Sequence, residues 1–256
     1  MWASSAATGS AQSIYDRLLC YLDLMNRRIF SAVLLASVFS ATLVFAQSGA
    51  APAPDAPAPL PGYLPDPTAS SGELMEGAWV FQSRTVLIRM TPLTDETRSA
   101  YIREKTGSLL DPFGPRPDGS PRFISFLLEI LNRSDGPLAF EPQKCWLLAP
   151  PGELKLPVDL ARIQTGYSVH EQDMPEQFTV AGQALINGEQ ILPPGHKVSG
   201  LLVFSAPSKS PREFRIELQL MNSRGKTLEY KAAYATEKRL QKKMKKLLRQ
   251  QEKGAS

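Results

Sequence analysis

The chain has 256 residues, of which 43% are hydrophobic and 21% charged, and its formal net charge is +4. This composition is that of an ordinary globular protein, and the length allows one or two domains. The charge is uneven: residues 237–253 carry eight Lys or Arg against Glu237 and Glu252. The rest of the chain is therefore weakly acidic, which argues against a nucleic-acid-binding surface spread over the whole domain.

An export signal is predicted near the N-terminus. Arg27 and Arg28 precede an apolar run over residues 29–46, which ends in the small residue Ala46. A charged segment, an apolar segment and a cleavage site in this order are typical of a secretory signal peptide. We therefore interpret residues 25–46 as the signal and residues 1–24 as an upstream extension of the reading frame, and we expect a periplasmic or secreted protein.

A membrane anchor is the alternative interpretation of the same run. Its eighteen residues, 29–46, give a helix of about 27 Å at about 1.5 Å per residue. This length is marginal for a hydrocarbon core of about 30 Å. The small residues at the end favour cleavage over retention.

Residues 47–72 are rich in alanine and proline. Closely spaced prolines lack backbone donors and favour an extended polyproline II conformation, so we predict a semi-rigid spacer without a core. The prolines are Pro52, Pro54, Pro57, Pro59, Pro61, Pro65 and Pro67.

Strand patterns recur from there to residue 235. In the run 213–221, Phe214 and every second residue after it are apolar, which is typical of a strand with one solvated face. Many short strands without helices of crossover length predict a mainly β, antiparallel sandwich over residues 73–235. The runs are 85–90, 122–131, 137–148, 153–160, 178–180, 184–192, 197–204, 213–221 and 226–234.

One helical insertion is expected within the sandwich. Residues 94–105 begin with Thr94, a favourable N-cap residue, followed by acidic residues in the first turn. Residues 106–121 form a loop rich in glycine and proline.

Residues 236–256 are predicted to form a basic helical tail. Leu240, Met244, Leu247 and Leu248 recur at helical spacing and form a narrow apolar stripe. A basic amphipathic helix can lie on anionic lipid or bind another polyanion, whereas a frayed, solvated helix is the structural alternative. The candidate contact residues are Lys238, Arg239, Lys242, Lys243, Lys245, Lys246 and Arg249.

Three segments resemble parts of the bacterial extracytoplasmic immunoglobulin-like domains of unknown function. Residues 126–138 combine an apolar strand, an Asn, a turn and Pro-Leu; residues 145–153 combine an aromatic strand and a Gly turn; residues 192–204 carry a Pro-Gly entry to a late strand. The resemblance covers residues 79–234. It implies an immunoglobulin-like sandwich in the cell envelope and supplies no catalytic residues. The insertion at 94–121 departs from the family's shorter pattern.

Sequence motifs for metal binding or catalysis are weak in this chain. His170 and His196 have no Cys or carboxylate at metal-ligand spacing, so no metal or cofactor is expected. Common nucleophile and phosphate-loop motifs do not occur. A hydrolase site assembled from His170, Asp159 and Glu171 stays open as an alternative from the enzyme class.

Several isolated residues have structural interpretations. Cys145 lies in an apolar run and is expected in the core, with a partner-linking thiol as the alternative. Trp79 and Trp146 are expected in the core or at its rim. Tyr63 and Phe113 fall in Pro-rich segments and are expected to be exposed, where aromatic residues can serve as contact anchors.

These observations favour a non-enzymatic envelope protein whose sandwich binds or scaffolds another protein. The competing hypothesis is association with a membrane or wall surface through the basic tail. Specific nucleic-acid binding is not expected.

Overall fold

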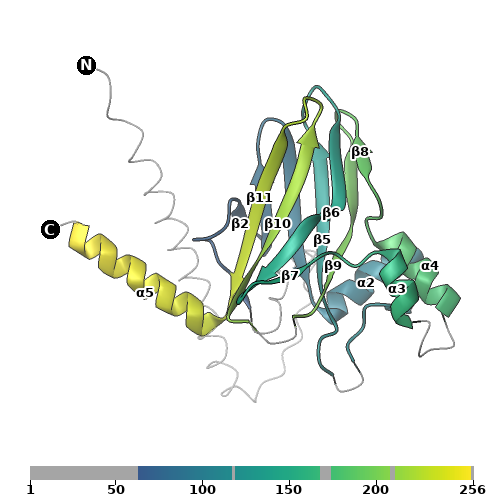
Figure 1. Ribbon diagram of the computed structural model, residues 1–256, viewed down its shortest axis with the longest axis horizontal. Helices are drawn as coiled ribbons and strands as arrows, with labels where there is room; N and C mark the ends of the chain where they lie inside the picture. Colours follow the sequence, from purple (N-terminus) through teal and green to yellow (C-terminus); the bar gives the residue numbers. More distant parts are fainter. Residues whose placement is uncertain (1–62, 117–118, 168–173, 208–210, 255–256) are drawn as a thin grey trace, which may run out of the picture. The chain divides into compact units, whose positions relative to one another are not determined.

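The computed structural model describes residues 63–116, 119–167, 174–207 and 211–254 (Figure 1). The predicted upstream extension, the export segment and residues 47–62 of the predicted spacer lie outside this part of the chain. Among the described helices, none combines the length and the apolar character that a membrane crossing requires.

The strands form two antiparallel sheets, which confirms the predicted antiparallel β-sandwich (Figure 1). The six-stranded sheet has the order β1-β11-β10-β6-β7, with β8 also paired to β6. It contains β1 (Leu64–Pro65), β6 (Leu138–Ala149), β7 (Glu153–Lys155), β8 (Gln190–Leu192), β10 (Glu213–Asn222) and β11 (Thr227–Ala235). The five-stranded sheet contains, in order, β2 (Glu73–Met75), β3 (Ala78–Gln82), β4 (Val86–Leu93), β5 (Phe123–Asn132) and β9 (Lys197–Ser205).

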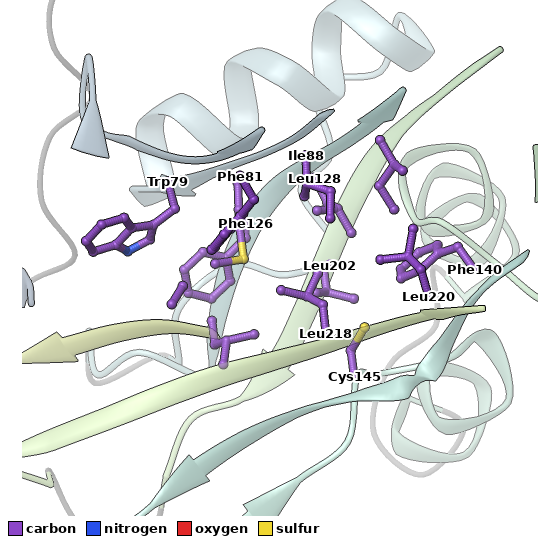
Figure 2. Packing of buried hydrophobic residues seen from close by; sticks show 14 of the residues in the cluster. Trp79, Phe81, Ile88, Phe126, Leu128, Phe140, Cys145, Leu202, Leu218 and Leu220 are labelled. Carbon is purple, nitrogen blue, oxygen red and sulfur yellow. The ribbon is translucent and has the colours of Figure 1, made fainter. Parts of the chain in front are cut away.

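The main core lies between the two sheets (Figure 2). Phe214, Ile216, Leu218 and Leu220, the alternating residues of β10, are at most 2% exposed, as their spacing predicts. Burying a large apolar side chain contributes about 1.5–3 kcal/mol, so this row supplies much of the cohesion between the sheets. Its partners from the five-stranded sheet include Trp79, Ile88, Met90, Phe126, Leu128, Ile130 and Leu202.

A second core lies on the other face of the five-stranded sheet. The helices α2 (Asp95–Thr106), α3 (Leu160–Tyr167) and α4 (Met174–Ala184) contribute to it, together with β9. Leu201 and Val203 of β9 face this helical core, whereas Leu202 and Phe204 face the inter-sheet core. Because both faces of β9 are covered at residues 201–204, these four residues are all apolar instead of alternating.

The helix α4 corrects two strand predictions. The segment 178–180 and the start of the segment 184–192 are helical, and only residues 190–192 of the latter form a strand. Phe178-Thr179-Val180 has strand-like composition, but Val180, Ala181 and Ala184 are spaced for one helical face and are buried against the sheet. Similarly, the predicted strand 153–160 is reduced to β7, and α3 begins at Leu160.

The predicted helical insertion is present as α2, and local residues specify both of its ends. The Thr94 side chain accepts from the Thr97 backbone N–H at 3.2 Å, and the Thr97 hydroxyl accepts from the Thr94 N–H at 2.8 Å. This reciprocal capping box satisfies two amide groups that the first helical turn leaves without partners. Gly107 ends the helix with φ of 74°, a left-handed conformation that favours glycine.

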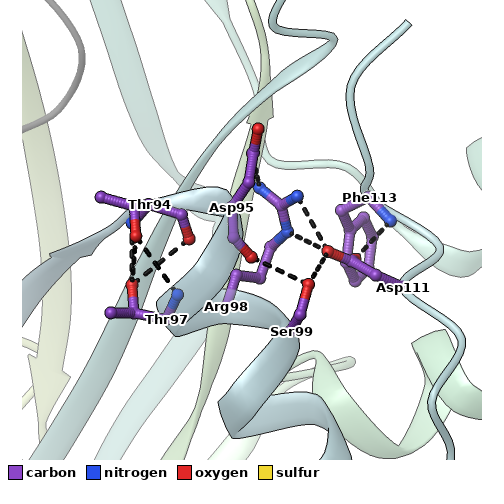
Figure 3. Close-up of polar contacts among 7 residues, drawn as sticks. All are labelled: Thr94, Asp95, Thr97, Arg98, Ser99, Asp111 and Phe113. Atoms are coloured by element: carbon purple, nitrogen blue, oxygen red, sulfur yellow. Dashed lines mark hydrogen bonds and ion pairs between the residues drawn. The ribbon is translucent and has the colours of Figure 1, made fainter. Parts of the chain in front are cut away.

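A buried arginine fastens the following loop to α2 (Figure 3). The guanidinium of Arg98 lies 2.8 Å from Asp95 and 2.8 Å from Asp111, and the Ser99 hydroxyl also donates to Asp111 at 2.9 Å. The other oxygen of Asp111 accepts from the backbone N–H of Phe113 at 2.9 Å. These contacts hold Phe113 at 1% exposure, so its predicted role as an exposed anchor is wrong.

The sandwich begins before the predicted end of the spacer. Leu64 and Pro65 pair with the end of β11, and the Tyr63 ring packs edge-on against Phe214 with centroids 5.0 Å apart. The Tyr63 hydroxyl donates to the Pro211 carbonyl at 2.7 Å. Residues 63–72 are therefore an edge of the domain. Tyr63 is half-buried against Phe214 of β10 and the Pro211 carbonyl, so its predicted exposure is wrong.

Candidate functional site

The basic tail forms the helix α5 (Glu237–Gly254), as its sequence predicts. It follows β11 after a single residue, Thr236, whose carbonyl accepts from the Leu240 N–H at 2.9 Å (Figure 1). The short connection leaves little freedom between strand and helix. The start of α5 is consequently tied to β11 of the six-stranded sheet.

Four charged residues fasten the first two turns of α5 to the sandwich. Lys243 Nζ lies 2.7 Å from Asp66 Oδ2 and 2.6 Å from Glu213 Oε2. Arg239 Nη2 lies 3.0 Å from Glu213 Oε1, and its Nε donates to Glu213 Oε2 at 3.3 Å. We call these four residues the latch; Leu240, which follows Arg239 in the chain, is 2% exposed. The latch combines ion pairs with apolar burial, so it positions the helix more firmly than a surface salt bridge would.

Asp66 is the most deeply buried member of the latch, with a side chain 1% exposed. Its Oδ1 accepts from the backbone N–H and the hydroxyl of Thr68 at 3.0 and 2.6 Å, while Oδ2 faces Lys243. A buried carboxylate is costly unless it is hydrogen-bonded and paired. Here both oxygens are satisfied, and Lys243 supplies the countercharge.

The latch also shifts the pKa values of its members. The hydrogen bond from Arg239, followed by the one from Lys243, lowers the pKa of Glu213 below its ordinary value. Burial acts to lower the pKa of Lys243, but its hydrogen bonds to Asp66 and Glu213 outweigh this effect and the pKa is raised. Glu213 and Lys243 therefore stay charged near neutral pH, and their ion pair persists.

Five further cations whose side chains the structure describes lie on the side of α5 opposite Leu240. At about 100° per residue they occupy an arc of about 100°, centred opposite Leu240, and no acidic residue falls within it. All five are exposed, and across the described residues none of them forms an ion pair with a carboxylate. We call this set the basic face: Lys238, Lys242, Lys245, Lys246 and Arg249.

The seven predicted contact residues therefore divide into two groups. Five form the basic face and are available to a partner. Arg239 and Lys243 instead face Glu213 and Asp66, so their role is to position the helix. Helical periodicity does not separate the two groups, because Arg239 lies only about 20° around the helix from Lys246. The division comes from the carboxylates of the latch, which lie in distant segments.

The apolar stripe of α5 is covered at its start and open further along. Leu240 is buried, Met244 and Leu247 are half-buried, and Leu248 is 43% exposed. Burial of the stripe is therefore greatest at the N-terminal end of α5, next to the sandwich. Around the helix axis, Leu240 lies about 170° from the centre of the basic face and Leu248 lies about 110° from it.

The residues of the alternative hydrolase site do not form a described cluster. The side chain of Asp159 accepts from the Arg162 backbone N–H at 2.8 Å and caps the start of α3. His170 and Glu171 lie outside the described residues. His196 is exposed, and its ring contacts the Pro194 carbonyl. Within the described ranges, no group of three His, Cys, Asp or Glu side chains is arranged to hold a metal ion.

Cys145 and the tryptophans occupy structural positions. Cys145 is fully buried between the sheets, and burial raises the pKa of its thiol to about 12. Trp79 is likewise buried in the inter-sheet core. Trp146 is half-buried on the outer face of the six-stranded sheet, where its Nε1 donates to Glu217 Oε2 at 2.9 Å. The core interpretation of Cys145 and Trp79 is confirmed.

Sequence reasoning missed both carboxylates of the latch. Asp66 precedes Pro67 and Thr68 in a segment predicted to be a spacer, and the Asp-Pro-Thr sequence is the only local signal of a turn that the aspartate stabilises. Glu213 opens an alternating strand, where a charged residue is unremarkable. Their pairing with α5 depends on tertiary structure.

Comparisons with known proteins leave the family open. No protein-family profile and no curated protein sequence matches the chain. Among solved structures it is similar to the yjhA protein from Bacillus subtilis, with 12% identity over 54% of this chain and 76% of that one, at a TM-score of 0.28. It is also similar to the putative ApaA protein from Bordetella pertussis, with 9% identity over 59% and 92% of the two chains, at a TM-score of 0.29. Scores this low support no transfer of family or function.

Proposed function

We propose that this chain is an exported, non-enzymatic binding protein of the bacterial cell envelope, and that the basic face of α5 is its contact element for a polyanionic partner. The single observation that carries this proposal is the division of cations within α5. Arg239 and Lys243 are neutralised by the latch, whereas the five cations of the basic face have no carboxylate partner among the described residues.

A merely solvated tail would not need this arrangement. A solvated helix would make no ion pair with a buried carboxylate of the sandwich. In this protein Lys243 pairs with Asp66, which is buried. Holding a helix in place reduces the conformational entropy that binding must remove, which strengthens its contact with a partner. A concentrated row of like charges also accelerates encounter with an anionic partner in a salt-dependent way.

The exported location is supported by sequence alone. The segment 25–46 has the order of a secretory signal, and residues 47–62 continue the proline-rich spacer pattern. In the proposed arrangement the spacer separates the sandwich from its point of attachment or release. The sandwich then acts as the rigid scaffold that presents α5.

The proposal is tested with a defined soluble polyanion, long-chain inorganic polyphosphate. Binding is measured by fluorescence anisotropy of labelled polyphosphate at low and high salt. A basic-face variant carries Lys238→Gln, Lys242→Gln, Lys245→Gln, Lys246→Gln and Arg249→Gln. A matched control removes five exposed cations elsewhere: Arg103→Gln, Lys105→Gln, Arg133→Gln, Arg224→Gln and Lys226→Gln.

The two variants have equal net charge, so they separate position from total charge. We expect the basic-face variant to lose salt-sensitive binding and the control to keep most of it. Equal losses in both variants, or undiminished binding by the basic-face variant, would overturn the proposal.

A further inference from the structure

We propose that the polyanionic partner is an anionic lipid bilayer, and that the chain docks on its surface through the basic face while the apolar stripe stays turned away from the lipid. This inference rests on the proposed function and deepens it by naming the partner. It depends on three features of α5: its charge pattern, the residue types on the basic face, and the orientation that the latch imposes.

The charge pattern matches a diffuse anionic surface. From Lys238 to Arg249 the basic face extends over eleven residue steps, or about 17 Å at about 1.5 Å per residue. Four of its five cations are lysines, which act as flexible point charges and do not require the bidentate geometry that arginine favours. A layer of lipid headgroups satisfies such a row without any fixed register. Each cation near an anionic bilayer strengthens binding by about fivefold.

The residue types on the basic face disfavour other macromolecules. Protein interfaces usually centre on apolar or aromatic residues, but no apolar residue lies within the basic arc. Binding of single-stranded nucleic acid relies on aromatic side chains that stack on bases, and α5 contains no Phe, Tyr or Trp. Attraction between opposite charges is therefore the dominant interaction that this face offers.

The latch determines which side of α5 can meet the bilayer. Leu240 is buried, and Arg239 and Lys243 pair with carboxylates of the sandwich. Rolling the apolar stripe into lipid would require Leu240 to leave its contacts and would break the pairing of Lys243 with the buried Asp66. The intact protein therefore binds peripherally, with Leu248 outside the hydrocarbon core.

The experiment is co-sedimentation of the full chain with vesicles of phosphatidylcholine, with and without phosphatidylglycerol, at low and high salt. We expect binding only to the anionic vesicles and its loss at high salt. Lys242→Gln with Lys245→Gln should weaken binding roughly 30-fold, fivefold for each cation. The control pair Lys105→Gln with Lys226→Gln should leave affinity within about twofold.

A third variant, Leu248→Gln, tests the orientation. Leu248 is the most exposed residue of the apolar stripe, at 43%. Peripheral docking predicts affinity within about twofold of the parent protein, whereas insertion of the stripe predicts a loss of about tenfold or more. A loss in this variant would overturn the proposed orientation.

The outcomes separate this inference from the proposed function. Binding to polyphosphate without binding to anionic vesicles would overturn the lipid assignment and leave the proposed function standing. Binding to neither probe would overturn both. Equal binding to vesicles with and without phosphatidylglycerol would also exclude the electrostatic mechanism.

Discussion

The Nζ atom of Lys243 lies 2.7 Å from Oδ2 of Asp66, although 177 positions separate the two residues in the chain. Asp66 belongs to the segment that pairs with the edge of β11, and Lys243 lies in the second turn of α5. The contact therefore links the beginning of the described domain to its C-terminal helix. The direction in which the basic face points depends on this pairing as much as on α5 itself.

Lys243→Met is expected to lower the free energy of unfolding by about 3 kcal/mol, because it leaves the buried Asp66 carboxylate without its countercharge. Urea denaturation followed by circular dichroism measures the change. Lys242→Met, one residue away on the basic face, is the control and should alter stability by less than about 0.5 kcal/mol. Equal effects of the two substitutions would contradict the role assigned to the latch.

Stability should decline in acid through Glu213. Hydrogen bonds from Arg239 and Lys243 lower the folded-state pKa of Glu213 below the ordinary value of 4.5. A carboxyl whose pKa is depressed by folding contributes stability that is complete above the ordinary pKa and is lost as pH falls through the folded-state pKa. Unfolding measured from pH 6 downwards should therefore show a steeper loss below about pH 4.5 in the parent than in Glu213→Gln. Parallel pH profiles would contradict this assignment.

The elements that could be predicted from sequence were those with a strong local signal. The alternation of Phe214, Ile216, Leu218 and Leu220 marks β10 because one face of that strand is buried and the other is solvated. Thr94 marks the start of α2 because its side chain caps the helix within three residues. In both cases the physical cause lies within a few residues of the signal.

The features that could not be predicted depend on distant partners. Val180 follows an aromatic and a β-branched residue, yet it is helical because α4 packs on the five-stranded sheet. Asp66 and Glu213 carry no local sign of their contact with α5; Lys243, their shared partner, is 177 positions from Asp66. The seven basic residues were recognised as one group, and only the tertiary structure divides them into the latch and the basic face.

Asn132 joins three segments of the sandwich, and its removal should be costly. It is fully buried; its side-chain amide donates to the carbonyls of Gly136 and Leu192, both at 2.8 Å, and its oxygen accepts from the Ser134 N–H at 2.9 Å. Asn132→Ala leaves these groups unsatisfied and should lower the free energy of unfolding by about 3 kcal/mol. Thermal and urea denaturation measure the loss.

The matched control for Asn132 is Asn222 in the hairpin between β10 and β11. Its side-chain oxygen accepts from the backbone N–H groups of Arg224 and Lys226 at 3.0 and 2.9 Å, on the exposed side of a turn. Water can replace the lost acceptor there, so Asn222→Ala should cost only about 1 kcal/mol. If the two alanine variants lost equal stability, the buried hydrogen bonds of Asn132 would not have the stabilising role assigned to them.

Cys145 should be unreactive in the folded protein. Its thiol is fully buried, and burial raises its pKa to about 12, so at pH 8 only about one molecule in ten thousand carries the thiolate that reacts. In a Cys20→Ser background, where Cys145 is the only thiol, iodoacetamide should modify the native protein only as fast as the sandwich opens. The same reagent should react within minutes in urea, since unfolding exposes the thiol and removes the burial that raises its pKa. Mass spectrometry over a time course measures both rates, and native labelling as fast as labelling in urea would show that Cys145 is not part of the inter-sheet core.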